Sequence, residues 1–474
     1  MADERTQDLG SLDRDVARAW TALVRWRAGL ARKPDDVAGD DPIAPVRHVA
    51  GKSTWDALRA LSPGLGEGPL RDALVPWVGV LTLARLGRDE EVEQAEAMAK
   101  ATGRLAIDPV RLVTWREAWR GVARATSVTE AARWLDAAAE ASGELAAIAR
   151  RKAATRVEVA RRLGLDHPWE LLNLEGAQAP GGLSGTGFSQ SGLNVGKPAG
   201  LRAVARRLLD ATEDLARAVW KEAPGAPVGA AAVLHVANAR DAGDGWPTRV
   251  TARWLGEVIA VPTAGLKIDL PALPSPAGAA TFARALGAFG VALHGAWVPR
   301  AMPFALGHEP GERAARRLGF VLGALVADPA WQTRALGVVR RTALAQSRVL
   351  GRTLLLEARL QAARVLLADE ADPSPRDLVD ELIPRVFGAP LDARLRGAWP
   401  VARDDEPSRL VALIESRAAA DGLRDRFDVD WFRNPRAWTS LRGEAASPER
   451  SPVDGDVLAA QADALARAFE GALG

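Results

Sequence analysis

Apolar residues recur at three- and four-residue spacing along most of the chain, with charged residues between them. The pattern is clearest in residues 15–30 and 127–163, where Leu, Val, Ala and Trp are interspersed with Arg, Asp and Glu. This period predicts amphipathic α-helices throughout residues 12–172, and the alternation typical of strands is scarce there. The breaks carry turn chemistry, as at residues 33–36. We therefore expect an all-α fold.

The second half of the chain continues the helical pattern. Helices are expected at residues 201–221, 280–298, 312–326, 331–367, 375–387, 408–420 and 457–473. Residues 225–276 contain repeated prolines, and this stretch, with residues 250–262 inside it, is the only place where we expect a short strand or two.

The helical pattern is interrupted at residues 175–200, where Gly, Ser, Pro and Ala replace the periodic residues. Such a composition is flexible or loop-like and marks a boundary between structural units. We predict an N-terminal helical lobe of residues 1–175, a Gly-rich loop or linker of residues 176–200, and a second helical lobe of residues 201–474. The glycines at 181–187 lack the preceding strand and spacing of a dinucleotide site, so we interpret them as a mobile loop.

The composition is that of a globular protein, with 48% hydrophobic and 26% charged residues. Arginine outnumbers lysine, but acidic residues are interspersed and the net charge is only +2, which argues against a nucleic-acid partner. The most apolar stretch, 280–298, is interrupted by Arg284 and His294 and predicts a buried helix, so no membrane partner is expected. The absence of cysteine excludes disulfides and thiolate chemistry, and with the polar N-terminal residues it favours a cytoplasmic protein.

Two familiar signatures fail on their spacing. Residues 51–54 read GKST, like the end of a phosphate-binding loop, but Val46 stands where that loop needs a glycine. Ser53 or Thr54 is instead expected to cap a helix that starts at Trp55. No two of the five histidines are three to five residues apart, as a helical or finger-type metal site requires. These histidines are His48, His167, His235, His294 and His308.

Residues 281–294 carry the most informative pattern in the chain. They read TFARALGAFGVALH, and the last eight letters resemble the HEFGHALH active-site helix of the thimet oligopeptidase and oligoendopeptidase family of zinc metallopeptidases. The positions that match the family letters are Phe289, Gly290, Ala292, Leu293 and His294. The resemblance places the first ligand His, the catalytic Glu and the second ligand His at Gly287, Ala288 and Val291, respectively.

These three differences lie at the positions that bind the metal and supply the catalytic carboxylate in the family motif. Two imidazoles one helical turn apart hold Zn²⁺, and the Glu beside the first takes a proton from the metal-bound water. The side chains of Gly287, Ala288 and Val291 offer neither a lone pair nor a titratable proton. The family also uses a Tyr to stabilise the oxyanion, and this chain contains no Tyr. The resemblance therefore implies a scaffold without zinc chemistry, and we expect no cofactor.

Three other segments extend the resemblance over about residues 145–440. Residues 156–167 resemble a family helix and turn of the form R-x-x-x-A-x-x-L-G-Y, with Leu165 at the aromatic position. Residues 427–435 resemble a late segment in which paired aromatics precede Asn-Pro. Residues 312–331 resemble the helix that supplies the third ligand, a Glu, and place Arg316 there to within one helical turn.

The resemblance implies a two-lobed, gluzincin-like helical scaffold with a long central cleft lined by residues 280–298 and 312–326. We expect a catalytically inactive pseudopeptidase that binds a peptide or protein partner in this cleft. The expected binding residues are His294, His308 and Arg316. Arg316 either stands in for the missing cation or pairs with a neighbouring acid, and the sequence does not choose between these roles.

Two alternatives stay open. The first is an active metallopeptidase with an unorthodox metal site built from His294, His308 and Glu309. The second is a structural helical component of a complex, which would expose a Trp-rich patch drawn from the 16 tryptophans.

Overall fold

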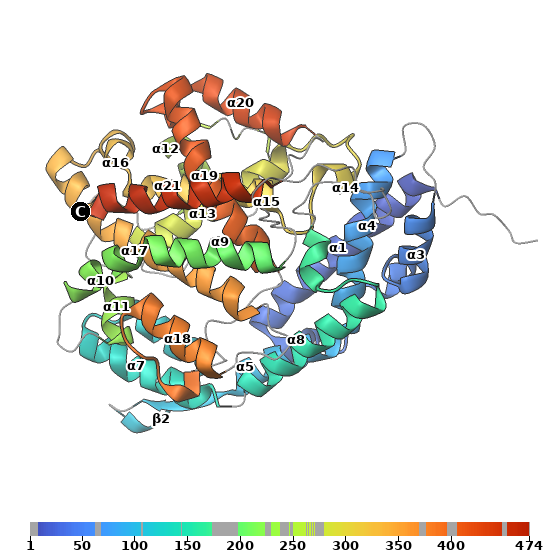
Figure 1. Cartoon of the computed structure of the whole chain (residues 1–474), viewed down its shortest axis with the longest axis horizontal. Helices are drawn as coiled ribbons and strands as arrows, with labels where there is room; N and C mark the ends of the chain where they lie inside the picture. The colour runs from blue at the N-terminus through green and yellow to red at the C-terminus, as the bar shows by residue number, and fades with distance from the viewer. Residues whose placement is uncertain are drawn as a thin grey trace, which may run out of the picture.

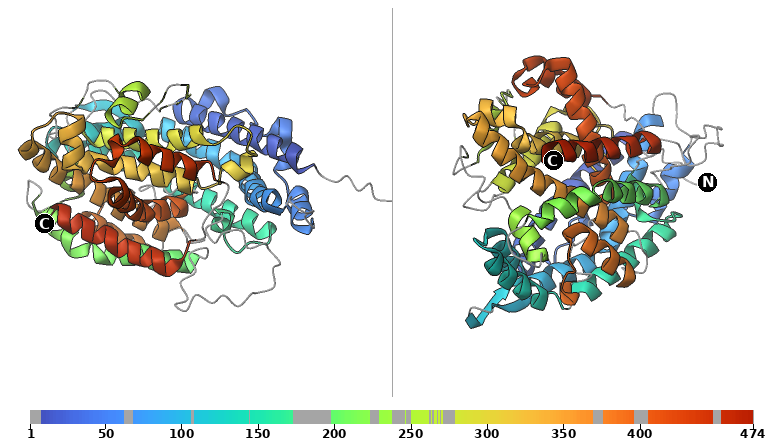
Figure 2. Two further views of the ribbon diagram at one scale, coloured as in Figure 1. Left: turned by 90° about the horizontal axis from the view of Figure 1, so that it is seen from above. Right: turned by 60° about the vertical axis from the view of Figure 1, so that its left-hand side comes forward.

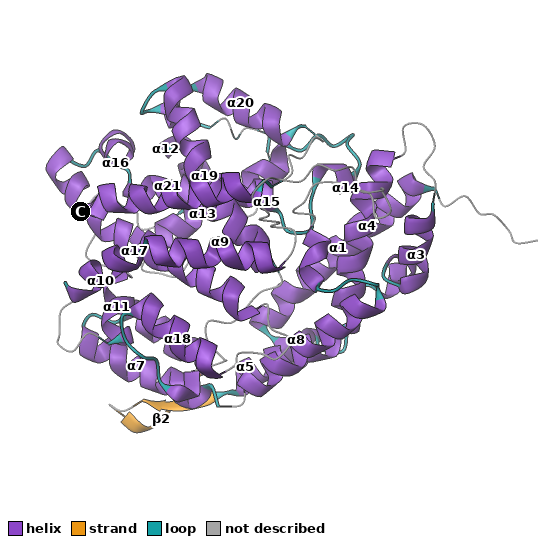
Figure 3. Ribbon diagram, in the orientation of Figure 1, coloured by secondary structure: helices purple, strands orange, loops and turns teal. Residues whose placement is uncertain are grey.

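The structure is a computed structural model of the chain. It describes residues 8–61, 68–105, 108–143, 145–172, 198–222, 229–237, 246, 250–261, 263, 265–266, 268, 270, 279–368, 376–395, 405–447 and 453–473. Helices make up most of this part of the chain, which confirms the all-α prediction (Figure 1, Figure 3). The predicted loop at 181–187 and most of the predicted linker lie outside the described residues. No helix within the described ranges is long and apolar enough to cross a membrane.

The N-terminal helices lie together at one end of the molecule, and the C-terminus lies at the opposite end (Figure 2). They are α1 (Leu9–Arg32), α2 (Pro34–Val37), α3 (Lys52–Ala60), α4 (Gly68–Leu86) and α5 (Arg88–Lys100), with a 3₁₀ turn at Ala44–Val49. Helix α1 begins where the Asp8 carboxylate accepts a hydrogen bond from the backbone N–H of Gly10 at 3.0 Å.

The start of α3 differs from the prediction. The helix begins at Lys52, with Gly51 at its N-cap and no side chain capping it. The Thr54 hydroxyl, which was expected to cap, donates to the carbonyl of His48 at 2.6 Å instead. Thr54 thereby ties the preceding turn to the helix, so the capping interpretation was wrong.

A β-hairpin occupies a region for which only helices were expected. Strand β1 (Thr102–Leu105) pairs antiparallel with β2 (Asp108–Thr114). The strands are too short to show a clear alternation in sequence. At Gly103 an added Cβ would lie 2.0 Å from the carbonyl oxygen of Ala137, so this glycine lets the hairpin lie directly on the backbone of a neighbouring helix.

Three helices follow the hairpin: α6 (Trp115–Arg124), α7 (Val128–Ala141) and α8 (Leu145–Arg162). The expected continuous pattern at 127–163 is therefore two helices. Helix α8 ends at Arg162, and Gly164, two residues later, has a φ of +78°, the left-handed conformation that is common just after a helix end. A 3₁₀ turn at Pro168–Leu172 comes next.

The second half is also helical, and every segment expected there is present within the described residues, although 201–221 and 331–367 are each split in two. Gly337, with φ +68°, lies in the break of the second pair. The helices are α9 (Pro198–Ala211), α10 (Glu213–Lys221), α11 (Ala230–Ala237), α12 (Ala252–Val258), α13 (Ala279–Trp297), α14 (Phe304–Gly307), α15 (Arg313–Ala324), α16 (Pro329–Ala335), α17 (Arg340–Ala368), α18 (Arg376–Phe387), α19 (Glu406–Phe427), α20 (Pro435–Ala445) and α21 (Gly455–Leu473).

A short strand or two was expected within residues 225–276, but the described residues 252–258 form helix α12 instead. The Thr251 hydroxyl accepts from the backbone N–H of Trp254 at 3.1 Å and caps the helix. Leu255 is fully buried. Local capping and one buried contact therefore outweighed the strand propensity of the valines and isoleucine nearby.

Within the described residues, three buried hydrophobic clusters form the core. One joins α1, α3 and α4; a second joins α7, α9, α17 and α21; the third joins α12, α13, α15 and α20. The second cluster contains residues from both sides of the predicted linker, from Leu105 to Phe469. The lobe limits at 175 and 201 stay a prediction.

Candidate binding site on helices α13 and α15

Helix α13 has one buried face and one accessible face. Its large side chains pack into the third core cluster; they are Phe282, Leu286, Phe289, Leu293 and Trp297. The opposite face carries Arg284, which is exposed, and four partly accessible residues: Gly287, Ala288, Val291 and His294. Because residues three and four apart share a helix face, the positions that correspond to the zinc motif lie together on the accessible side.

Helix α15 packs antiparallel on α13, backbone against backbone. A Cβ placed on Gly290 would lie 2.8 Å from the Cα of Gly319, and one placed on Gly319 would lie 2.7 Å from the carbonyl oxygen of Gly287. One turn further along α15, a Cβ placed on Gly323 would lie 3.1 Å from the carbonyl oxygen of Ala283. Glycine is required where two helix backbones approach this closely. This register places Arg316, one turn before Gly319, near the level of Val291.

Arg316 is held by two acids. Its Nη2 lies 3.0 Å from Oε2 of Glu312 and also pairs with the carboxylate of Asp405, immediately before α19. Its Nε donates to the carbonyl of Gly311 at 3.1 Å. Of the two roles left open by the sequence, the structure therefore has Arg316 paired with neighbouring acids.

Glu312 itself sits in an unusual position. Its φ of 52° places it in the left-handed region, which a residue with a side chain rarely adopts. Burial raises the pKa of its carboxyl, and the nearby Arg316 opposes this rise. The start of α15 is therefore a strained and charged segment beside the accessible face of α13.

His294, His308 and Glu309 come near one another at the same end of this face, where α13 ends and α15 begins. Burial lowers the pKa of His294 to about 4, and the negative charge of Glu309 only partly opposes that effect. The ring of His308 stacks on Phe304, with ring centroids 4.9 Å apart. Oε1 of Glu309 accepts from the backbone N–H of Ala314 at 2.7 Å, in the first turn of α15.

The segment between α13 and α15 is anchored to the N-terminal helices. The buried carboxylate of Asp13 on α1 accepts from the backbone N–H groups of Phe304 and Ala305 at 2.7 and 2.8 Å. The indole of Trp77 on α4 packs on Phe304 and donates to the carbonyl of His308 at 3.2 Å. Distant parts of the chain therefore position His308 and Glu309.

These residues do not fit a zinc ion. Gly287, Ala288 and Val291 have no atom that can coordinate a metal, and the Arg316 guanidinium repels one. Within the described ranges no group of three or more His, Asp or Glu side chains is arranged to hold a metal. The side chains of His294, His308 and Glu309 therefore do not form such a group. The site offers a small, apolar helix face bordered by buried charges.

Two residues near this face were not singled out from the sequence. Arg284 lies one turn before Gly287 on the same side of α13 and is exposed. Glu357 on α17 is also exposed, and the positive charge of Arg284 acts on its carboxyl. The helical spacing of Arg284 from Gly287 is a signal that could have identified the arginine, whereas no sequence signal brings Glu357 to it.

Residues 156–167 and 427–435, which carry part of the resemblance, lie at the end of α8 and just before α20. At the end of α8, Leu163 accepts from the indole of Trp55 at 2.9 Å, which joins the helix end to α3. Before α20, the Asn434 side chain accepts from the backbone N–H of Arg436 at 3.0 Å and caps the helix. Trp431 and Phe432, just before this cap, are buried in the third core cluster.

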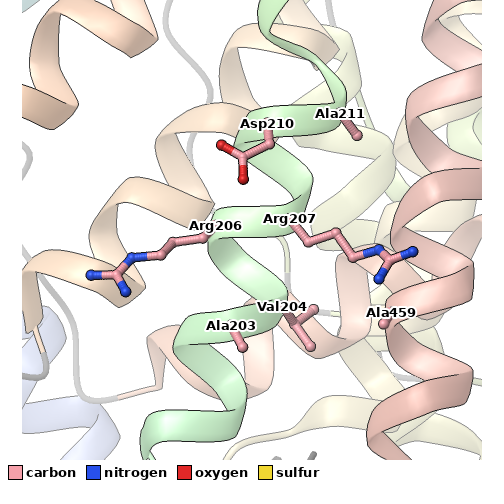
Figure 4. Close-up of a pocket in the computed structure, with 7 residues that line it drawn as sticks. All are labelled: Ala203, Val204, Arg206, Arg207, Asp210, Ala211 and Ala459. Carbon is pink, nitrogen blue, oxygen red and sulfur yellow. The ribbon is translucent and has the colours of Figure 1, made fainter.

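An open cavity of about 620 Å³ lies elsewhere, between α9 and α21. Arg206 and Arg207 extend to opposite sides of α9, and Arg207 reaches α21 (Figure 4), where it pairs with Asp463 at 2.6 Å. None of its lining residues belongs to α13 or α15, so this cavity is separate from the candidate site.

The fold is an all-helical one in which α13 and α15 pack closely against each other. No protein-family model and no curated protein sequence matches the chain. Solved structures do share its fold. One, from Bacillus anthracis str. Ames, is described as an oligoendopeptidase F and matches with a TM-score of 0.55 at 12% identity, over 94% of this chain and 85% of that chain. Another is PZ peptidase A with an inhibitor, with a TM-score of 0.52 at 12% identity, over 94% and 86% of the two chains.

These likenesses confirm an oligoendopeptidase-like fold over nearly the whole chain. At this level of identity they concern the fold alone. They carry no information on whether this chain cleaves peptides, which depends on the residues of the site.

Proposed function

We propose that this protein is a pseudopeptidase that binds a peptide in a cleft beside α13 and α15 and does not cleave it by zinc chemistry. The proposal rests on one observation about α13. Its face is accessible, and none of the positions on that face that correspond to the ligand His and catalytic Glu residues of the motif carries a side chain that can bind a metal. Gly287, Ala288 and Val291 keep this face small and apolar. Such a face accommodates a peptide chain but cannot activate water.

The charges around the face support binding over hydrolysis. The guanidinium of Arg316 already pairs with Glu312 and Asp405, so it completes a structural ion network in place of a metal ligand. His294 is kept neutral near pH 7 by its lowered pKa. A neutral imidazole offers a hydrogen-bond donor and an acceptor to a peptide backbone.

The proposal is tested with a randomised octapeptide pool. The purified protein, incubated with the pool and excess ZnCl₂, is expected to retain peptides in an equilibrium binding assay and to leave all of them uncut by mass spectrometry. The matched variant is Ala288→Glu, which returns the catalytic carboxylate without the metal ligands and should remain inactive. Zinc-dependent, chelator-sensitive cleavage by the wild type would favour the active-enzyme alternative, and failure to retain any peptide would refute the binding role.

A further inference from the structure

Lys152 is a partly buried amine whose hydrogen-bond partner carries no charge. It lies on α8, which packs against α5. Its Nζ donates to Oε1 of Gln94 on α5 at 2.9 Å, and this is the one hydrogen bond that the nitrogen forms within the described ranges. A neutral amide oxygen compensates the charge of an ammonium group only weakly. The site therefore favours the uncharged amine.

The acids nearest to Lys152 are bound to other donors. Oε1 and Oε2 of Glu91 accept from Nε and Nη2 of Arg27 at 2.8 and 3.1 Å. Oε1 of Glu90 accepts from the hydroxyl of Thr155 at 2.6 Å. No carboxylate in the part of the chain that the structure describes forms an ion pair with Lys152.

Two guanidinium groups act on the same amine. Arg156 lies one turn further along α8, on the same side of the helix, and Arg27 acts from α1. Burial first, and then the charge of Arg156, lower the pKa of the Lys152 amine to about 7, although Glu90 and Glu91 oppose this effect. A substantial fraction of the amine is therefore uncharged at neutral pH, and the uncharged amine is the nucleophilic form.

We propose that Lys152 is a carbamylation site, at which the amine adds carbon dioxide and the charges of Arg156 and Arg27 stabilise the carbamate that forms. The lone pair of Nζ forms a bond to the carbon of CO₂, and the electrons of one carbon–oxygen π bond move to the oxygen. The proton lost from the nitrogen passes to solvent. This proposal is independent of the proposed peptide-binding function.

The charge of the product explains why CO₂ is the expected reagent. Carbamylation replaces a cation beside two guanidinium groups by an anion, so a repulsion becomes an attraction. An acetyl group would give a neutral amide, which gains no such attraction. Carbon dioxide is also small and uncharged, and it can reach an amine that is only partly accessible.

Two other lysines provide internal controls because each is paired with an acid. Nζ of Lys52 lies 2.8 Å from Oδ2 of Asp56, and Nζ of Lys100 lies 3.0 Å from Oε2 of Glu96. The hydrogen bond to Glu96 raises the pKa of Lys100. Both side chains are more exposed than Lys152, so accessibility alone would favour their reaction.

The test uses the full-length wild type, equilibrated at neutral pH with isotopically labelled bicarbonate. Triethyloxonium ion then converts any carbamate into a stable ester, which is located by mass spectrometry of the digested protein. Labelling of Lys152 is expected to exceed that of Lys52 and Lys100 by at least about tenfold, because far more of its amine is uncharged. Labelling of Lys152 no higher than that of these two lysines would overturn the proposal.

Variants then test the role of the guanidinium group. Arg156→Gln is expected to reduce labelling of Lys152 by about three- to tenfold, because the repulsion that favours the free amine and the attraction that holds the carbamate are both lost. The control is Arg150→Gln, at an exposed arginine of the same helix, which should keep full labelling. Undiminished labelling in Arg156→Gln would contradict the proposed stabilisation by Arg156.

A second measurement does not depend on chemical trapping. The carbon NMR spectrum of the protein in labelled bicarbonate should contain a carbamate signal that Lys152→Arg removes and Lys100→Arg retains. A signal that persists in Lys152→Arg would place the carbamate elsewhere and overturn the proposal. The comparison among lysines of the wild type decides the proposal even where a variant fails to fold.

Discussion

At the scale of single residues, His294 shows how burial changes the chemistry of a position that resembles an active-site residue. Its ring is partly buried among Glu309, His308 and Arg317, and burial lowers its pKa to about 4 from an ordinary value of 6.5. The folded protein therefore resists protonating this ring more than the unfolded chain does. Above pH 6.5 the ring is neutral in both states, and the stability it contributes is fully present.

This difference predicts an acid-dependent loss of stability. As the pH falls from 6.5 towards 4, the unfolded chain takes up a proton that the folded protein excludes, which costs roughly 2 kcal/mol at pH 5. Chemical unfolding of wild type and His294→Asn at pH 7 and pH 5 measures this. The wild type should lose about 2 kcal/mol more than the variant between the two pH values. Identical losses would show that His294 titrates normally.

Sequence reasoning identified some of these residues but could not assign their partners. The resemblance placed Arg316 on the helix beside the motif, yet its pairing with Asp405 depends on how α15 meets the start of α19. Arg284 and Glu357 lie 73 positions apart in the numbering, and only the packing of α13 on α17 brings their charges together. In an amphipathic pattern, a charged residue is predicted only to face solvent, and the pattern does not indicate its partner.

At the scale of elements, the contact between α13 and α15 depends on glycines that the sequence pattern treats as weak points of a helix. Glycine is unfavourable inside a helix, so its repetition at Gly287, Gly290, Gly319 and Gly323 indicates a packing requirement. The structure shows this packing requirement, because the backbones of α13 and α15 touch at these glycines.

The contact predicts opposite effects for two glycine substitutions in the same helix. Gly290→Ala places a Cβ 2.8 Å from the backbone of Gly319, so the helices must separate, and we expect a loss of about 1–3 kcal/mol in the free energy of unfolding. Gly295→Ala meets nothing within 4 Å and should be neutral or stabilise by up to about 1 kcal/mol. Urea unfolding of the two variants checks this; equal stabilities would mean that α13 and α15 are not in backbone contact.

Most helices were predictable because their apolar faces are buried and the period is explicit, as in α1 and α13. The errors have local causes. The break between α7 and α8 is a short turn at Ser142 that leaves the apolar spacing nearly continuous. The hairpin β1–β2 is held by its fit against α7 at Gly103, which no local pattern records.

At the scale of the whole molecule, the fold was accessible from the sequence because residues 287–294 resemble the family motif at its apolar and glycine positions, although they differ from it at Gly287, Ala288 and Val291. Phe289, Gly290 and Leu293 are core or helix-contact residues, whereas Gly287, Ala288 and Val291 lie on the accessible face. The arrangement of distant parts was not accessible. The hydrogen bond from the Phe304 backbone N–H to the Asp13 carboxylate joins residues 291 positions apart, and only the folded chain reveals it.

The central claim is that the oligoendopeptidase-like scaffold of this protein has no zinc site. The most direct test is the zinc content of the purified full-length protein, measured by mass spectrometry of the metal after saturation with ZnCl₂ and removal of free ion. We predict well under one zinc per chain, because Gly287, Ala288 and Val291 provide no ligand and the guanidinium of Arg316, which pairs with Glu312 and Asp405, repels a metal ion. One zinc per chain that survives gel filtration and is removed only by a strong chelator would contradict the account.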